Sequence, residues 1–360
     1  MAADILISFI IPVWNREKTI GFCIDSILSQ YLDMNFEIII VDDYSSDNSV
    51  HLVEELRGNK FSNSLNTSYL AKILPVSSLL FEDLDLASEL KIRSRINIVK
   101  LPKHQGAAIA RNKGIEKANG MYIWFVDSDD FIANGALKTI KSNLLTYHFD
   151  ILRFGKQNFT RFPDKYRITC LNKGLRIMNM NNIQDLLYML QTGAVWCAVF
   201  RRDFIANNRF DARFSYSEDS LFSWQITLKA KTAAYLDVLL YGYMYTSGSL
   251  TSVKPYERFD CYISVVENYV KAIKTSYRLN KEKSILMNVC ERRLYLHAFH
   301  TFTFSEINSI MWNRWYEVYY NVMINNNMRA VWKRLISYIL WKLHSNKLFN
   351  IIYNRFIKVQ

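Results

Sequence analysis

The chain has 360 residues, of which half are hydrophobic, so it can bury a core and is too apolar for wholesale disorder. Its formal net charge is +12, but residues 241–360 hold 17 Lys and Arg against 7 Asp and Glu, so most of the excess lies there. Five cysteines without a CxxC spacing argue against a disulfide framework or a zinc site and favour a reducing compartment.

The chain opens with "MAADILISFIIPVW", which has no positively charged leader, so we expect no signal peptide. No window approaches the ~18 uninterrupted apolar residues of a membrane-spanning helix. We therefore expect a cytoplasmic protein.

The first half of the chain alternates buried strands with helices, which is typical of a parallel α/β sheet. In such sheets, ligands bind outside the carboxyl ends of the strands. We expect strands at 7–13, 36–43, 96–101 and 121–126, and helices at 17–30, 46–57, 106–118 and 134–145.

Residues 59–95 interrupt this alternation, because about 37 residues stand where a short connection suffices. The segment 79–90 in this insertion reads as a helix that serves as a lid or a contact surface. From about residue 256 the pattern becomes helical and aromatic. We predict a domain at 1–250, with the insertion, and a helical, basic region at 251–360.

The pair Asp42-Asp43 ends the second expected strand and runs into "YSSDNS". One interpretation is an acidic turn in which Ser45, Ser46 or Asp47 caps the next helix. The other is a binding site, in which the Asp43 carboxylate accepts the imide N–H of a uracil or the hydroxyls of a ribose.

The sequence "WFVDSDD" places Asp127, Asp129 and Asp130 directly after a buried strand. A cap for the helix at 134–145 needs one side-chain oxygen, whereas three neighbouring carboxylates repel unless a cation or several donors lie between them. Mg²⁺ or Mn²⁺ binds through one or two carboxylates plus substrate phosphates. The sequence therefore favours a divalent-metal site.

Two helix starts carry further candidates. The helix at 106–118 presents free backbone N–H groups and Arg111, which suit a phosphate, although its alanines also suit close packing on the sheet. The sequence "SEDSLF" begins another helix with Glu218 and Asp219, for which Ser217 is the candidate cap. Chemically, Asp219 can act as a general base toward an acceptor hydroxyl.

Five segments in order carry a family resemblance: "SFIIPVWNREKTIGFCIDSILSQ", "EIIIVDDYSSDNS", "GAAIARNKGIEKANGMYIWFVDSDD", "VWCAVFRRDFI" and "SEDSLF". Together they resemble the family two glycosyltransferases with the GT-A fold, bacterial enzymes that build capsule, lipopolysaccharide and exopolysaccharide. The resemblance covers roughly residues 5–250 apart from the insertion. It implies an α/β fold with a Rossmann-like, nucleotide-binding mixed sheet flanked by helices, here followed by a C-terminal helical extension.

The resemblance also implies roles for single residues. Trp14 replaces the usual Tyr of the first motif, which keeps a stacking face but changes its polar edge. The implied roles are Pro12, Val13 and Trp14 beside the nucleotide base, Asp43 on uracil, Asp127 and Asp129 on the metal with Asp129 as the direct ligand, Asp130 on the donor sugar, Glu218 and Trp196 at the acceptor, and Asp219 as the catalytic base. We also assign Asp127 to the nucleotide, together with Arg111 through the phosphate contact inferred above.

The implied activity is an inverting, Mn²⁺- or Mg²⁺-dependent sugar transfer from a nucleotide donor, for which UDP is our first choice. The acceptor would be a saccharide or a polyprenyl-linked saccharide. A sugar nucleotidyltransferase is disfavoured, because "PVWNREKT" lacks the Gly-rich loop that clasps a triphosphate. A noncatalytic, nucleotide-sugar-binding membrane scaffold remains the alternative from another class.

The last residues of the chain are basic and aromatic. Residues 329–360 contain seven Lys and Arg and no acidic residue, which favours a helix lying on an anionic membrane surface at the inner face of the cytoplasmic membrane. The alternative is a helix packed on the catalytic domain. Nucleic acid is a poorer partner, because charge alone is weak support. His297 and His300 read as core or interface residues rather than metal ligands.

Overall fold

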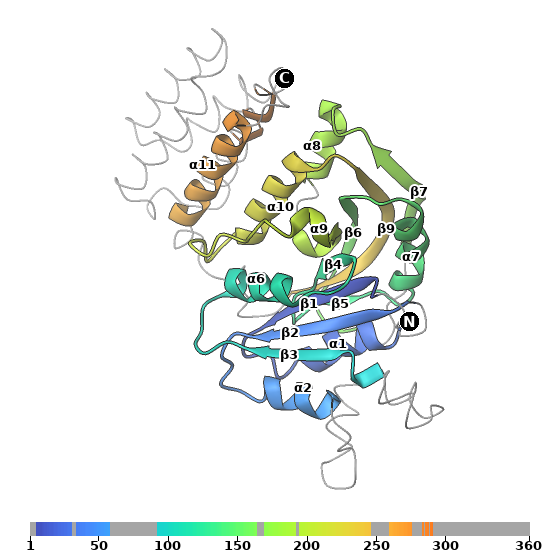
Figure 1. Ribbon diagram of the computed structural model, residues 1–360, viewed down its shortest axis with the longest axis vertical. Coiled ribbons are helices and arrows are strands. Elements are labelled where there is room, and N and C mark those ends of the chain that lie inside the picture. The colour runs from blue at the N-terminus through green and yellow to red at the C-terminus, as the bar shows by residue number, and fades with distance from the viewer. Residues whose placement is uncertain are drawn as a thin grey trace. The chain divides into compact units, whose positions relative to one another are not determined.

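The computed structural model describes residues 5–30, 34–57, 92–163, 169–191, 194–245 and 259–275, together with 283, 285–287 and 289–290. The chain divides into two compact units, Met1–Ser247 and Gly248–Gln360. The first unit contains the sheet, and the second contains α11 (Phe259–Thr275) (Figure 1). Among the helices of the described residues, none combines the length and the apolar character needed to cross a membrane.

Within the described residues, nine strands form one mixed sheet in the order β3-β2-β1-β4-β8-β6-β9-β5, with β7 paired to β9. Neighbours among β1 to β4 are parallel, whereas β8 is antiparallel to both β4 and β6. The strands are β1 (Ile7–Val13), β2 (Phe36–Asp42), β3 (Ile96–Lys100), β4 (Tyr122–Phe125), β5 (Phe131–Ile132), β6 (Ile151–Phe159), β7 (Thr169–Met178), β8 (Ala198–Arg201) and β9 (Ala233–Met244).

Helices cover both faces of the parallel strands. Right-handed crossovers in this strand order place α1 and α2 on one face and α6 on the other, and Figure 1 shows α6 and α2 on opposite sides of the strands. The helices of the first unit are α1 (Ile20–Leu28), α2 (Ser49–Arg57), α6 (Ala107–Lys117), α7 (Ala136–Thr146), α8 (Ile183–Gln191), α9 (Arg202–Ile205) and α10 (Glu218–Lys229), with the 3-10 turn η1 (Val195–Cys197).

The central strands read as continuous apolar runs because they are covered on both faces. Every residue of β2 is buried, and so is all of β1 except Pro12. Helix α6 lies very close to β1: a methyl group added at Gly114 would come within 2.2 Å of the Ile10 side chain. The position of α6 above the sheet is therefore set by the absence of a side chain at residue 114.

The fold class that the sequence predicts is confirmed. The four expected strands agree with β1 to β4 within one residue at each end, because their apolar runs are uninterrupted. Two helices begin about three residues later than expected, at Ile20 and Ser49, since the residues before them form a hydrogen-bonded pair of loops. Most of the insertion 59–95, the helix at 79–90, both histidines 297 and 300, and the tail 329–360 lie outside the described residues.

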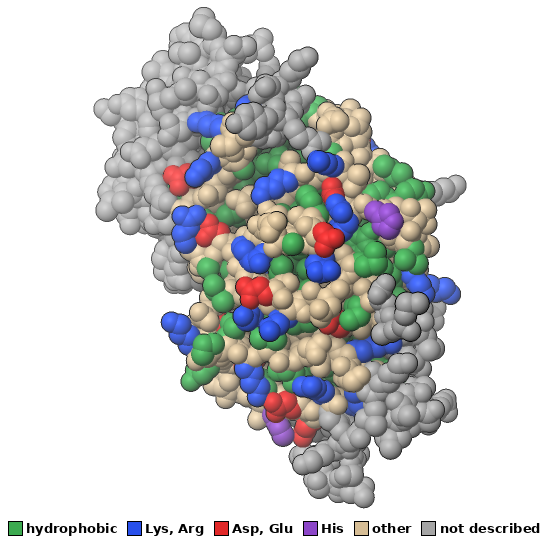
Figure 2. Space-filling view, viewed as in Figure 1, with side chains coloured by type: hydrophobic (Ala, Val, Ile, Leu, Met, Phe, Trp, Pro, Cys, Tyr) green, Lys and Arg blue, Asp and Glu red, His purple; other side chains and the backbone are tan. Residues whose placement is uncertain are grey.

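On the face shown in Figure 2, described Lys and Arg side chains lie among Asp and Glu side chains. This mixture matches the near balance of acidic and basic residues before residue 241.

Candidate active site

The candidate site forms where β1, β2 and β4 end. The three strands are parallel and neighbouring, with Val13 paired to Asp42 and Ile10 paired to Phe125. Their carboxyl ends therefore open at one edge of the sheet, as the fold class predicts. The loops that follow them carry the acidic clusters.

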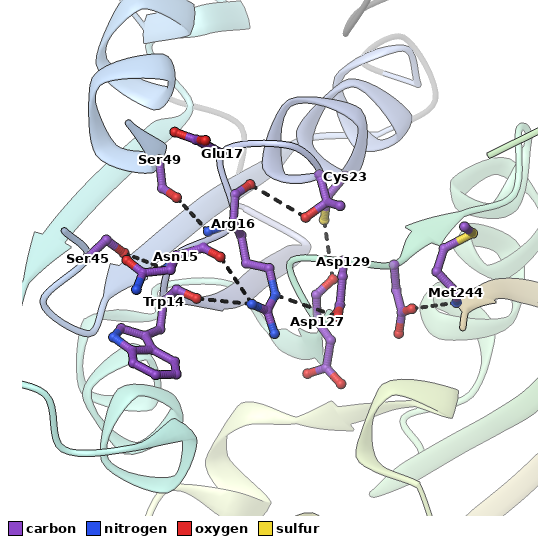
Figure 3. A network of polar contacts seen from close by, with 12 residues as sticks. Trp14, Asn15, Arg16, Glu17, Cys23, Ser45, Ser49, Asp127, Asp129 and Met244 are labelled. Carbon is purple, nitrogen blue, oxygen red and sulfur yellow. Dashed lines mark hydrogen bonds and ion pairs between the residues drawn. The ribbon is translucent and has the colours of Figure 1, made fainter. Parts of the chain in front are cut away.

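The loops after β1 and β2 are joined by hydrogen bonds (Figure 3). The N–H of Asn15 donates to Ser45 Oγ at 3.0 Å, and the N–H of Arg16 donates to Ser49 Oγ at 2.7 Å. Asp47 accepts from the N–H of Ser49 at the start of α2, so it supports that helix start as the acidic-turn interpretation proposes. The acidic-turn interpretation is thus compatible with a binding site at the same loops.

Asp43 fastens the start of α6 to the end of β2. Its Oδ1 accepts the N–H of Gln105 and its Oδ2 the N–H of Gly106, both at 2.7 Å. His104 Nδ1 lies 2.8 Å from Asp43 Oδ2, and the His104 ring stacks on Trp14 with 4.2 Å between ring centroids. The binding of uracil by Asp43 stays a prediction, and the carboxylate already holds three partners.

The other base-site residues surround this cluster. Val13 is buried, and its carbonyl accepts the N–H of Asp43 at 2.8 Å. Pro12 is half-buried within β1, whereas Trp14 and Tyr44 are exposed. The edge thus offers aromatic surface to solvent directly beside Asp43.

The three carboxylates after β4 point to three different partners. Asp127 Oδ1 accepts from Arg111 at 2.7 Å, and Asp129 lies 3.6 Å from Arg16 Nε. Asp130 is buried and accepts from the Tyr241 hydroxyl and from the N–H of Met244, at 2.7 and 2.8 Å. Donor groups of the protein therefore offset much of the negative charge for which the sequence analysis invoked a bound cation.

Asp130 does not join the other two. Burial, together with the charges of Asp127 and Asp129, raises the pKa of Asp130 well above its usual range. Both of its oxygens hold the turn after β4 to β9, so its predicted contact with a donor sugar has no support from its surroundings. None of the three carboxylates caps α7, which begins after Gly135 without a side-chain cap.

Arg111 connects the turn after β4 with helix α10. Its guanidinium is buried, with Nη2 2.7 Å from Asp127 Oδ1 and Nη1 2.7 Å from Glu218 Oε1. Burial opposes its charge, but the two carboxylates outweigh this effect and raise the pKa of Arg111. The predicted contact of Arg111 with a phosphate is thus disfavoured, because its side chain is occupied inside the protein.

Asp219 follows Glu218 in the first turn of α10 and remains partly exposed. Burial, and then the charge of Glu218, raise the pKa of Asp219 to about 6. Its Oδ1 accepts the N–H of Ser220 at 2.6 Å. Ser217 adopts a positive φ of 60° and makes no side-chain cap, contrary to the capping interpretation.

Trp196 belongs to a layer of aromatic rings beside the carboxylates. Its ring stacks on Tyr241 and Tyr243, with centroid distances of 4.8 and 5.4 Å, and Lys156 Nζ lies 4.8 Å from its centroid. Since Tyr241 also bonds Asp130, this layer adjoins the turn after β4. The side chain of Trp196 is buried, so its predicted contact with an acceptor stays a prediction.

Comparison with known proteins identifies the family. The model of Glycosyl transferase family 2 matches residues 8–67 and 82–208, more than half of the chain. The chain belongs to glycosyltransferase family 2. The resemblance noted from the five sequence segments is thereby confirmed.

Two similar curated proteins come from bacteria. The family 2 chain is 27% identical to the uncharacterized glycosyltransferase EpsJ of Bacillus subtilis over 70% of this chain and 64% of EpsJ. It is 25% identical to the glycosyltransferase GlyA of Streptococcus pneumoniae over 70% of this chain and 32% of GlyA. The chain thus spans less than two thirds of the length of these two relatives.

Among solved structures, the family 2 chain is similar to Staphylococcus aureus TarS 1–349. The complex of TarS with UDP has a TM-score of 0.65 at 17% identity, covering 99% of this chain and 92% of that one. The complex with UDP-GlcNAc has a TM-score of 0.64. This similarity confirms the GT-A fold.

The donor set suits a hard divalent cation. Asp127 and Asp129 offer carboxylate oxygens, which Mg²⁺ and Mn²⁺ prefer, and both side chains keep partial exposure. Among the described residues, no three His, Cys, Asp or Glu side chains gather in a metal-binding group. One or two carboxylates are sufficient for such an ion when phosphates complete its coordination.

Three residues of the site were not singled out from the sequence. Arg16 and His104 lie in the loops that follow two expected strands. Their position close to a strand end was the one sequence signal that could have marked them as site residues. Tyr241 lies inside β9, and nothing in its surroundings along the chain marks it. Its contact with Asp130 exists only in the folded protein.

Proposed function

We propose that this family 2 glycosyltransferase moves a sugar from a UDP-linked donor to a hydroxyl of a saccharide or lipid-linked saccharide, with inversion at the anomeric carbon. The observation that carries the proposal is the link through Arg111, which joins the donor-side carboxylate Asp127 to the helix turn that bears Asp219. Family membership and the UDP complexes of the similar TarS fold support it.

Asp219 is the proposed general base. With its pKa raised to about 6, it is mostly ionised at neutral pH and still basic enough to take a proton from an attacking hydroxyl. The acceptor oxygen attacks C1 of the sugar as the bond to the diphosphate breaks on the opposite side. Glu218, held by Arg111, fixes the turn that aims Asp219.

The donor side is proposed to bind the diphosphate near Asp127 and Asp129. A bound Mn²⁺ or Mg²⁺ would be held by Asp129, with help from Asp127, and would offset the charge of the leaving diphosphate. Arg16, 3.6 Å from Asp129, holds that carboxylate beside the end of β1. The exposed ring of Trp14 would pack against the base.

The deciding experiment pairs Asp219→Asn with a control. The Asn variant should bind UDP as the wild type does but lose transfer by ~10²-fold or more, the usual contribution of a general base. Asp203→Asn, at a side chain 78% exposed on α9, should leave both unchanged. Transfer by Asp219→Asn at near wild-type rate contradicts the assignment.

A panel of nucleotide sugars separates the proposed enzyme from the alternative. Turnover of UDP-sugars above GDP- or CDP-sugars supports the donor class. UDP binding without turnover on any acceptor favours a noncatalytic scaffold instead.

Membrane association through residues 329–360 is a separate proposal that rests on sequence charge alone. Co-sedimentation with vesicles tests it: the full chain should bind vesicles rich in anionic lipid and not vesicles of phosphatidylcholine. A role in capsule, lipopolysaccharide or exopolysaccharide synthesis would follow from the acceptor that the enzyme uses.

A further inference from the structure

A row of aromatic rings leads from the turn after β4 to the surface. The ring of Trp196 stacks on Tyr241 on one side and on Tyr243 on the other contact. Tyr243 in turn meets Tyr245 edge to face, with 5.4 Å between the ring centroids. Tyr241 is fully buried, whereas Tyr245 is 55% exposed. The row therefore connects the acidic turn with solvent, and its outer rings offer apolar surface with polar edges.

Lys156 on β6 is exposed and lies over two of these rings. Its Nζ is 4.1 Å from the ring centroid of Tyr243 and 4.8 Å from that of Trp196. Cation–π contacts of this kind hold an ammonium group in place, and the group has three N–H donors. Throughout the described part of the chain, no carboxylate pairs with Lys156. Its charge is therefore available to an anionic ligand.

Arg153 fixes this row of rings beside α10. Its Nη1 donates to the carbonyl of Ala194 at 3.2 Å, directly before the turn η1 that carries Trp196. Its Nη2 donates to Ser223 Oγ at 2.6 Å, and Ser223 lies about one helical turn beyond the proposed base Asp219 on α10. Arg153 itself is fully buried and cannot meet a ligand from solvent. The exposed cation beside the helix of the proposed base is thus the lysine over the rings.

We propose that Lys156 binds an anionic group of the acceptor, a carboxylate or a phosphate, while Tyr243 and Tyr245 pack against the sugar that carries it. The inference rests on the proposed sugar transfer and narrows its acceptor to acidic saccharides. An ammonium attracts an anion by its charge as well as by hydrogen bonding, whereas a hydroxyl group offers only the hydrogen bond. Because Asp219 is itself a carboxylate, a cation near it also offsets the repulsion that an acidic acceptor meets on approach.

The test measures binding by ligand-observed NMR on the full chain, with UDP and MgCl₂ added to fill the donor site. One arm compares methyl β-D-glucuronide with methyl β-D-glucoside, and the other compares glucose 1-phosphate with the same glucoside. Wild type should bind the charged ligand of at least one arm about tenfold more tightly, the size of one hydrogen bond to a charged group. The arm that shows the preference tells a carboxylate from a phosphate. Lys156→Met should bind charged and neutral ligands about equally, and Lys156→Arg should keep the preference.

Lys138→Met, at an exposed lysine of α7, is the matched control and should keep the wild-type preference. Thermal melting should show that each variant is folded. Equal binding of charged and neutral ligands by wild type, or binding of neither, overturns the inference, and so does a preference that persists in folded Lys156→Met. Turnover of UDP-sugars tests the proposed transfer separately. Turnover on neutral acceptors alone removes the anionic site and leaves the transfer standing, whereas a chain without any turnover loses both the transfer and the acceptor role of Lys156.

Discussion

Arg111 Nη1 lies 2.7 Å from Glu218 Oε1, although 107 residues separate the two along the chain. The same guanidinium holds Asp127 at 2.7 Å. One buried cation therefore fixes the distance between the turn after β4 and the first turn of α10. The donor-side and acceptor-side groups of the proposed reaction are positioned by a shared partner.

Replacing Arg111 by Met should destabilise the protein by about 3–5 kcal/mol, because it leaves two carboxylates close together without their cation. Urea unfolding of the wild type and the variant measures the loss of stability. Lys113→Met on the same helix removes an exposed pair with Glu116 and should change stability by less than about 1 kcal/mol. Equal effects of the two variants would contradict the bridging role of Arg111.

The transfer rate should fall as the pH drops below about 6. Asp219 must be ionised to accept a proton in the proposed role, and its raised pKa means that it is half protonated near pH 6 rather than near pH 4. Glu218→Gln removes a negative charge that raises this pKa, so the acidic limb of the rate profile should move to lower pH. A flat profile between pH 5 and 7 would exclude Asp219 as the base.

Tyr241→Phe should cost about 1–3 kcal/mol of stability, since the hydroxyl donates to buried Asp130 and accepts the N–H of Asp127. Thermal or urea unfolding gives the value. Tyr245→Phe, which loses an exposed contact with Asn158, should stay within about 0.5 kcal/mol of wild type. The hydroxyl of Tyr241 has no structural role at this turn if the two variants match.

Metal binding should distinguish Asp129 from its neighbour Asp130. EDTA should abolish transfer and added Mn²⁺ should restore it, and Asp129→Asn should weaken Mn²⁺ binding and reduce transfer by ~10²-fold or more. Asp130→Asn should act on stability instead, because its side chain is buried against β9. Mn²⁺ titration followed by electron paramagnetic resonance distinguishes the two, and unchanged binding by Asp129→Asn would remove it as a ligand.

The sequence predicted the strands well because each is a continuous apolar run that ends abruptly at a polar residue. It also predicted that Asp43 and Asp127 lie at one edge, since parallel strands share their carboxyl ends. These two inferences depend only on neighbouring residues and on the rules of α/β folds.

Side-chain directions at that edge could not be predicted in the same way. The partner of Asp130, Tyr241, is 111 residues distant, so the turn shows three carboxylates but not that one faces inward. Arg111 stands near a helix start, which suggested a phosphate, yet its side chain pairs with α10. His104 acquires its orientation from Asp43, a contact that the sequence does not reveal.

The single hydrogen atom at Gly114 controls more than local packing. One turn before it on α6, Arg111 contacts both Asp127 and Glu218, so the depth at which the helix rests on Ile10 affects the position of that guanidinium. A methyl group at residue 114 would overlap the Ile10 side chain, so either that side chain or α6, with the guanidinium it carries, would have to shift. The alignment of the proposed reaction centre is thus expected to be sensitive to crowding beneath a helix that need not touch any substrate there.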